Sequence, residues 1–469
     1  MKQRIAITAV VIASIFMQRG VLGQSSPRQM EMAECPFARE EWAANLNAEC
    51  RWLIVPERRD HDDDRWVRLF IVILRAPQPS GRPPLGLLHG GPAESALLRM
   101  VRGASRQPLA RDIVIYDQRG AGLSQPDPCP AYPTTAAECA AFMRTHHIDP
   151  AAYSTPANVL DLMDLRVALG YDRWDLYGAS YGSRLAQEAM RRDPHGIRSV
   201  ILENPVPPGA EIAEAPLTTQ RALERVFAAC HRSATCHGTF SHPMEDFLAV
   251  FDTLVRTPVF VPPPDTTGDQ AVLDAEGFAP AIRRLLRSRE GIASLPLLLH
   301  ELRSGDRVRA AGELFRLARS GGGDPVRAAF WLVNCYDQFG PVYRARLDSI
   351  RSMAWPPLRG LGGSLAECPV WQESFAAPED FQPVKSDIPT LVVSGEFDPR
   401  TPLEFGRRIA ATLSRSYLFE MPGETHGGGP TGCRAAILAE FLQDPEHKPD
   451  GSCIPNMPAI EFLTAWQGM

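Results

Sequence analysis

The sequence is poor in lysine and has no excess of basic residues. Of 469 residues, 49 are lysine or arginine and 55 are aspartate or glutamate, so the formal net charge is −6. Lysine stands only at positions 2, 385 and 448, and arginine supplies the remaining basic charge. Proteins that bind nucleic acid or anionic lipid through charge present basic surfaces. The acidic balance therefore excludes both as expected partners.

Long apolar segments are lacking beyond the amino terminus. The best later candidate, residues 295–302, is too short for a membrane-spanning helix, which needs about 20 residues. At the start, the basic Met1–Arg4 precedes the almost wholly apolar Ile5–Met17, and small residues follow at Val21–Gly23. This pattern predicts a secretory signal peptide over 1–23, with an uncleaved anchor as the alternative. We expect a secreted or periplasmic protein that has no membrane partner after cleavage.

No cysteine is left over, because the ten cysteines are an even number and all follow the signal peptide. In an exported protein this favours disulfides. Their spacing suggests that neighbours pair, although it does not fix the connectivity: Cys35–Cys50, Cys129–Cys139, Cys230–Cys236, Cys335–Cys368 and Cys433–Cys453. A zinc site formed by Cys230, His231, Cys236, His237 and His242 is the alternative. We favour the disulfides and expect no metal and no organic cofactor.

The pentapeptide Gly178–Gly182, with the sequence Gly-Ala-Ser-Tyr-Gly, lies between two apolar segments. Residues 173–177 are typical of a short buried strand, and residues 183–192 are typical of a helix. Gly-x-Ser-x-Gly at a strand-to-helix turn is the nucleophile elbow of α/β-hydrolases. Such a turn holds the serine in a strained geometry above a helix N-terminus, which favours negative charge. The sequence therefore predicts Ser180 as a nucleophile.

A serine hydroxyl needs a base, and the base needs an orienting carboxylate, in the chain order Ser, Asp, His for this fold. Asp398 follows an apolar strand at 390–395, and His426 lies in a loop after a strand at 416–421. Taken singly, Asp398 could be a turn residue and His426 an ordinary loop histidine. Their order and their positions after strands predict a triad with Ser180.

Acyl transfer also needs two backbone N–H donors that face the developing oxyanion. In this fold one donor belongs to the residue after the nucleophile, here Tyr181, and the other to a loop after an earlier strand. The apolar strand 85–88 runs into His89–Pro92, and Gly91 is our candidate because glycine allows close approach of the main chain. The glycine-rich stretch Asp117–Ser124 is interpreted as a structural turn with an Asp–Arg pair.

Several motifs together resemble those of the tripeptidyl aminopeptidase and proline iminopeptidase group of serine peptidases. They cover most of the chain after the signal peptide: His89–Pro92, Asp117–Gly120, Tyr177–Ser183, Val333–Asp337, Glu367–Trp371, Gly395–Pro402 and the tail from Cys433 to Cys453. The tail is similar to the C-terminal region of the tripeptidyl aminopeptidase branch. The resemblance implies an α/β-hydrolase fold and a secreted exopeptidase that releases short peptides or a residue from free amino termini.

Two stretches depart from the usual pattern of this group. Ala93-Glu94 stands where a glycine usually follows the proline, and Leu202–Pro205 stands where Asp-Gly is more usual. Both lie near the predicted site, so the resemblance defines the fold better than the substrate. A carboxylesterase or lipase would use the same triad and oxyanion donors and is the alternative activity. A non-catalytic binding module would have a damaged triad, whereas every triad position is filled here.

The order of apolar and helical segments predicts one large α/β domain with an insertion. Strands alternate with helices from 84 to 204, which predicts a mostly parallel sheet with helices on both faces, after an antiparallel pair within 50–76. The proline-rich 205–209 marks a boundary, and mostly helical residues follow it. The predicted parts are a core over 24–205, a helical cap over 206–384 and the rest of the core over 385–469, in a monomer.

An aminopeptidase must recognise a protonated amine. A carboxylate out of water, at a fixed distance from the nucleophile, does this well. Asp337 is the leading candidate, followed by Glu203 and Glu94. The alternative is that these are solvated surface carboxylates with no role in binding.

Overall fold

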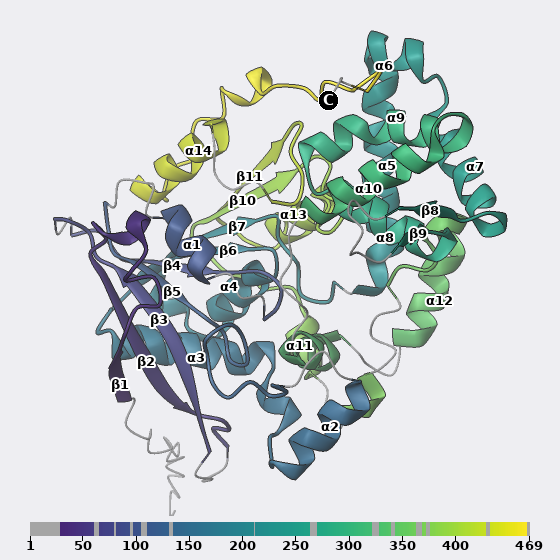
Figure 1. Ribbon diagram of the computed structural model, residues 1–469. Helices are drawn as coiled ribbons and strands as arrows, with labels where there is room; N and C mark the ends of the chain where they lie inside the picture. Colours follow the sequence, from purple (N-terminus) through teal and green to yellow (C-terminus); the bar gives the residue numbers. More distant parts are fainter. Residues whose placement is uncertain are drawn as a thin grey trace, which may run out of the picture.

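The computed structural model describes most of the chain (Figure 1). The described residues are 29–60, 65–78, 81–93, 97–104, 110–130, 135–210, 212–262, 270–320, 328–338, 343–362, 368–371, 376–427 and 432–466. The predicted signal peptide at 1–23 and the candidate Glu94 lie outside these ranges.

A nine-stranded sheet forms the centre of the fold, in the order β1-β2-β3-β5-β4-β6-β7-β10-β11. Its strands are β1 (Gln29–Ala33), β2 (Ala48–Pro56), β3 (Trp66–Leu74), β4 (Leu85–Leu88), β5 (Ile113–Tyr116), β6 (Trp174–Ala179), β7 (Ile197–Glu203), β10 (Thr390–Gly395) and β11 (Ser416–Met421). From β5 to β11 all neighbours pair in parallel, whereas β1, β2, β3 and β5 pair antiparallel. The mostly parallel sheet of the sequence prediction is confirmed.

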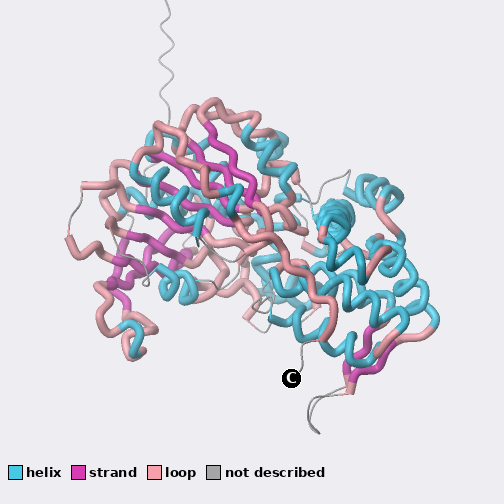
Figure 2. Tube along the Cα trace, turned by 90° about the horizontal axis from the view of Figure 1, so that it is seen from above, coloured by secondary structure: helices cyan, strands magenta, loops and turns pink. Residues whose placement is uncertain are grey.

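Helices cover both faces of this sheet (Figures 1 and 2). On one face, α3 (Thr155–Ala168), α4 (Tyr181–Arg192) and α13 (Leu403–Ala410) pack on a core that includes Ile71 and Ile73. On the other face, α1 (Leu97–Ala104) and α14 (Gly432–Gln443) pack on the alternate side chains of the strands. The near-continuous apolar sequence of β3 follows from its burial on both faces.

A helical insertion separates β7 from β10, as predicted. Its elements are α5 (Ala215–Arg232), α6 (Ala234–Thr239), α7 (Pro243–Arg256), β8 (Val259–Val261), β9 (Ala271–Leu273), α8 (Ala275–Leu285), α9 (Arg289–Ser304), α10 (Arg307–Ser320), α11 (Ala328–Gln338) and α12 (Tyr343–Met353). Most of them enclose a hydrophobic core distinct from the cores of the sheet. The exact division of the chain at 205/206 and 384/385 stays a prediction.

The remaining elements are short or lie in connections. Helix α2 (Ala136–Thr145) stands between β5 and α3 and begins with a capping box, in which Thr135 and Glu138 satisfy each other's backbone N–H groups. The one-turn 3-10 helices are η1 (Glu41–Ala43), η2 (Pro150–Ala152), η3 (Pro194–Gly196), η4 (Ile212–Glu214), η5 (Pro356–Leu358), η7 (Pro378–Phe381) and η8 (Ile454–Asn456).

The ten cysteines form five disulfides between neighbours, in the pairing that the spacing suggested: Cys35–Cys50, Cys129–Cys139, Cys230–Cys236, Cys335–Cys368 and Cys433–Cys453. The zinc alternative is wrong, since its two cysteines are bonded to each other. Among the described residues, no helix has the length and apolar character to cross a membrane.

Candidate active site

Ser180 stands at the turn between β6 and α4 with a backbone φ of 52°. This left-handed region is strained for a residue with a side chain. The flanking glycines permit the turn. A Cβ on Gly178 would lie 2.4 Å from the carbonyl oxygen of Gly182, and one on Gly182 would lie 2.0 Å from the carbonyl oxygen of Leu88. The Ser180 N–H donates to the Glu203 carbonyl over 2.9 Å, which fixes the turn to β7.

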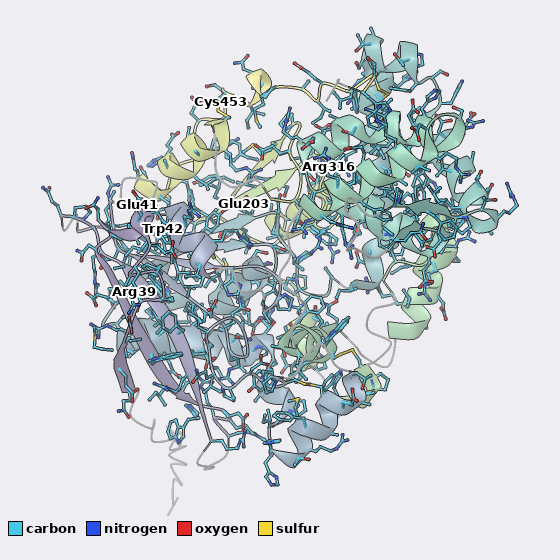
Figure 3. All side chains as sticks on the ribbon, viewed as in Figure 1. Arg39, Glu41, Trp42, Glu203, Arg316 and Cys453 are labelled. Atoms are coloured by element: carbon cyan, nitrogen blue, oxygen red, sulfur yellow. A yellow bond between two sulfur atoms is a disulfide. The ribbon has the colours of Figure 1, made fainter. Side chains whose placement is uncertain are left out.

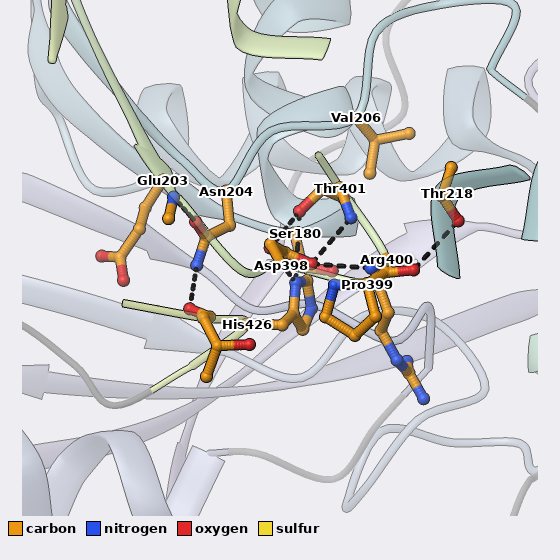
Figure 4. A network of polar contacts seen from close by, with 12 residues as sticks. Ser180, Glu203, Asn204, Val206, Thr218, Asp398, Pro399, Arg400, Thr401 and His426 are labelled. Atoms are coloured by element: carbon orange, nitrogen blue, oxygen red, sulfur yellow. Dashed lines mark hydrogen bonds and ion pairs between the residues drawn. The ribbon is translucent and has the colours of Figure 1, made fainter. Parts of the chain in front are cut away.

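Asp398 and His426 form a hydrogen-bonded pair (Figure 4). Nδ1 of His426 lies 2.7 Å from Oδ2 of Asp398, which is fully buried. Asp398 also accepts hydrogen bonds from the hydroxyl and the N–H of Thr401, over 2.6 and 2.8 Å. Burial opposes ionisation of Asp398, but the charge of His426 and these hydrogen bonds outweigh it and lower the pKa of Asp398. Asp398 is therefore a carboxylate that orients His426.

The sheet brings the predicted triad residues to one edge. Ser180 follows β6, Asp398 follows β10 and His426 follows β11, and these strands lie in the parallel order β6-β7-β10-β11. The side chain of Asn204, directly after β7, connects the loops. It accepts from the Gly395 N–H over 2.9 Å and donates to the Thr425 carbonyl over 3.3 Å. All three predicted triad residues thus stand at the carboxyl ends of parallel strands, where α/β-hydrolases hold their catalytic groups.

The loop after β4 lies beside Ser180. A Cβ on Gly90 would lie 3.0 Å from Cβ of Ser180, so the main chain of this loop passes directly beside the serine. Gly91 adopts a φ of 114°, which favours glycine. Nε2 of Gln118 donates to the His89 carbonyl over 3.1 Å and holds the loop. The main chain at Gly90, directly before the candidate Gly91, therefore lies beside Ser180, and Tyr181 follows Ser180 at the start of α4.

The glycine-rich turn at Asp117–Ser124 is structural, but its predicted Asp–Arg pair is wrong. Arg119 binds Asp161 of α3 instead, through two hydrogen bonds of 2.7 Å. Asp117 accepts from the Leu123 N–H over 2.9 Å. The partner of this arginine lies 42 residues away in the sequence, on α3.

Asp337 is not a surface carboxylate, since only 2% of it is exposed. Thr155 donates its hydroxyl and its N–H to this carboxylate, and Nε of Arg184 lies 3.4 Å from it. The Thr155 hydroxyl also bonds the hydroxyl of Tyr181 over 2.8 Å. Burial raises the pKa of Asp337, and Arg184 and Thr155 oppose that rise. Asp337 thus belongs to a buried network that ends at the residue after the nucleophile.

Glu203, which is labelled in Figure 3, is also buried rather than solvated. It accepts from Arg434 over 2.5 Å and from the hydroxyl of Tyr177. Arg434 also pairs with Glu424, two residues before His426. Burial raises the pKa of Glu203, and the opposing charges of Arg434 and His426 reduce this rise without cancelling it. Arg434 therefore ties the loop that holds His426 to the end of β7.

Sequence reasoning missed four of these residues. Thr401 had a local signal, because a threonine three residues after an aspartate is common in turns where the aspartate accepts backbone N–H groups. Asn204, Thr155 and Arg434 had none, since each acts on a segment far away in the sequence. Among the described residues, no group of three or more His, Cys, Asp or Glu side chains could hold a metal ion.

The fold is that of an α/β-hydrolase. Residues 83–232 match the family described as alpha/beta hydrolase fold, and residues 360–453 match the family of TAP-like proteins. The resemblance predicted from the motifs is confirmed at this level.

Curated relatives include two kinds of peptidase. Serine protease Hip1 of Mycobacterium tuberculosis is 27% identical over 288 residues, which are 57% of this chain and 54% of Hip1. Proline iminopeptidase of Xylella fastidiosa is 33% identical over 124 residues, which are 26% of this chain and 32% of that enzyme. The chain thus spans about half the length of Hip1 and a third of the iminopeptidase. Among solved structures, a proline iminopeptidase of Mycobacterium smegmatis is 18% identical, with a TM-score of 0.38, and covers 84% of this chain and 98% of its own.

Proposed function

We propose that the protein is an exported serine peptidase that releases short peptides or a residue from free amino termini through an acyl-enzyme. The observation that carries this proposal is the buried Asp398–His426 pair at the same sheet edge as the strained Ser180. The similarity to Hip1 and to proline iminopeptidases supports a peptide as substrate. The five disulfides support export, because they persist in oxidising compartments.

The proposed reaction has two stages. Ser180 attacks the scissile carbonyl while His426 takes its proton, and His426 then protonates the leaving amine. Water, activated by His426, releases the acyl group from Ser180. Asp398 stabilises the histidine when it is protonated, and the N–H groups of Gly91 and Tyr181 stabilise the oxyanion. The helical insertion acts as a cap that limits which peptides reach Ser180.

The substitution Ser180→Ala tests this reaction. The hydroxyl is the attacking group, so turnover of peptide amides should disappear while the far-UV circular dichroism and the melting temperature stay close to the wild type. A panel of aminoacyl and tripeptidyl amides, with short acyl esters as the comparison, defines the activity. If the wild type cleaves esters but no amide, the carboxylesterase proposal takes the place of the peptidase proposal. Full activity of Ser180→Ala would exclude the mechanism.

For the substrate amine we propose Glu203 in place of Asp337. Both carboxylates are buried and hydrogen-bonded, Asp337 to Thr155 and Glu203 to Arg434 and Tyr177, but the charge of Glu203 also acts on His426. Glu203→Gln should lower kcat/KM for free-amine peptides more than for amino-blocked ones. Equal losses of kcat/KM on both kinds of peptide would show that Glu203 acts only through its structural contact with Arg434.

A further inference from the structure

The corner between α8 and α9, in the insertion, packs on the histidine loop, residues 422–427. The Thr425 hydroxyl, one residue before the histidine, donates to the Leu286 carbonyl over 2.5 Å. Nη1 of Arg289, the first residue of α9, donates to the Gly423 carbonyl over 2.7 Å. Both contacts fall within three residues of the histidine. The main chain of the histidine loop is therefore held by the insertion as well as by the core.

Arg289 also binds a third segment, the C-terminal tail after η8. Its Nη2 donates to the carbonyls of Pro458 and Ala459, over 3.1 and 2.8 Å. The tail then reaches the insertion (Figure 1). There the Leu463 N–H donates to the Ala293 carbonyl of α9 over 3.0 Å. One guanidinium group thus joins the insertion, the histidine loop and the tail.

Gly423 fits this junction because it has no side chain. Its φ of 71° favours glycine. A Cβ at this position would lie 2.5 Å from Nη1 of Arg289 and 2.8 Å from the carbonyl oxygen of Pro458. The Gly423 N–H donates to Oε2 of Glu396, two residues before Asp398, over 2.9 Å. The junction therefore excludes a side chain at Gly423 and is tied directly to the segment that ends in Asp398.

The position of a catalytic histidine is critical, because proton transfer requires the donor and acceptor atoms to lie within hydrogen-bond reach. A misplacement of about 1 Å, even when it is caused far from the chemistry, can lower the rate about 100-fold. Hydrogen bonds from an ionised donor are stronger than neutral ones, and the planar guanidinium holds its acceptors in a fixed arrangement. An arginine that binds the main chain three residues before the histidine therefore has the strength and the geometry to fix this loop.

We propose that Arg289 is a positioning residue for His426, so that the insertion supports the chemical step in addition to limiting access to Ser180. This inference rests on the proposed triad but not on the nature of the substrate. A purely steric cap predicts losses that grow with the size of the substrate. A positioning residue predicts the same loss for every substrate, because each uses the same histidine in acylation and deacylation.

The test compares Arg289→Ala with Arg289→Lys and with the control Arg284→Ala. Both arginines are exposed, so their substitution leaves no cavity in the core. The substrates are a tripeptidyl amide and the small activated ester p-nitrophenyl acetate, and active sites are counted with a fluorophosphonate that labels Ser180. In Arg289→Ala, kcat per active site should fall about 10- to 100-fold on both substrates, while KM changes less than about 2-fold. Lysine keeps a charged donor and should recover part of the loss, and the control should change kcat less than about 2-fold.

Gly423→Ala tests the same contact from the histidine loop. Its side chain would displace the guanidinium, so kcat should fall, and the double variant with Arg289→Ala should be no slower than the slower single variant. Additive losses overturn the shared contact. A loss confined to the peptide overturns the positioning role, and so does a lower melting temperature with kcat per active site unchanged. If the wild type cleaves the ester but no amide, the peptidase proposal fails, while the ester kinetics still decide on Arg289.

Discussion

Two arginines near the histidine loop have opposite electrostatic surroundings. Arg434, from α14, is almost fully buried between the carboxylates of Glu203 and Glu424. Arg283, from the insertion, is acted on by the positive charges of Arg400 and Arg287 as well as by the negative charge of Asp398. A buried charge with two opposite partners holds segments together, whereas burial and nearby like charges disfavour the charged form of a cation. The core of the fold thus fixes the histidine loop through Arg434, whereas Arg283 in the insertion is a cation whose pKa is lowered.

The largest effect on activity should come from substitution of Asp398, the carboxylate whose charge acts on Arg283. Asp398→Asn should reduce kcat/KM about 10³- to 10⁴-fold, because the amide no longer orients or stabilises a protonated His426. Steady-state kinetics on a peptide amide measure this loss. Glu203→Gln is the comparison at the same sheet edge, and its overall loss should be much smaller. Similar losses in both variants would remove the distinction between the two carboxylates.

The next prediction compares how substitution of each of the two arginines changes the free energy of unfolding. Arg434→Met leaves two carboxylates unpaired, so the free energy of unfolding should fall by about 3–5 kcal/mol. Arg283→Met removes a cation whose pKa is lowered by burial and by Arg400 and Arg287, so the change should stay within about 1 kcal/mol. Urea denaturation at neutral pH measures both. An equal destabilisation would show that Arg283 is as tightly paired as Arg434.

A smaller effect concerns Asp337, whose network reaches Tyr181 through Thr155. Asp337→Asn should weaken the contact to Thr155 and lower kcat/KM about 10-fold, equally for free-amine and amino-blocked peptides. A positioning role predicts this parallel loss, mainly in kcat. A selective loss on free-amine peptides, mainly in KM, would restore Asp337 as the amine-binding residue.

The smallest effect is the acid stability that Asp398 contributes. Its pKa is lowered in the folded protein, so the ionised group stabilises the fold fully above its ordinary pKa, near 4. This contribution is lost as the pH falls through the lowered value. Below about pH 4, the wild type should therefore lose stability more steeply than Asp398→Asn. Unfolding midpoints at decreasing pH test this, and parallel curves for both proteins would contradict the cause assigned to the shift.

The sequence predicted the fold class and the positions of Ser180, Asp398 and His426, because each of these features has a local signal. An apolar strand precedes each residue, and the chain order Ser, Asp, His is the order that the triad has in this fold. Strand β1 had no comparable signal, since its five residues gain stability only by pairing with β2. The hairpin of β8 and β9 was missed for the same reason.

Charge pairing could not be predicted from the sequence. Arg119 was assigned to the nearby Asp117, yet it binds Asp161, and Asp337 was expected to face a substrate, yet it binds Thr155 and Arg184. Arginine is long and nearly every basic residue here is an arginine, so the chain offers many equivalent partners for each acid. Which of them meet depends on the packing of helices that are distant in sequence.

The hydrogen bond from Thr425 to the Leu286 carbonyl has a consequence for protein engineering. Insertions of related hydrolases are attractive units to exchange when a new specificity is wanted. In this protein the corner between α8 and α9 supplies a main-chain acceptor to the residue beside His426, and Arg289 binds the same loop. A chimera that replaces this corner would lose support for the histidine together with the old specificity. Grafts should therefore keep residues 286–289 and exchange the helices around them.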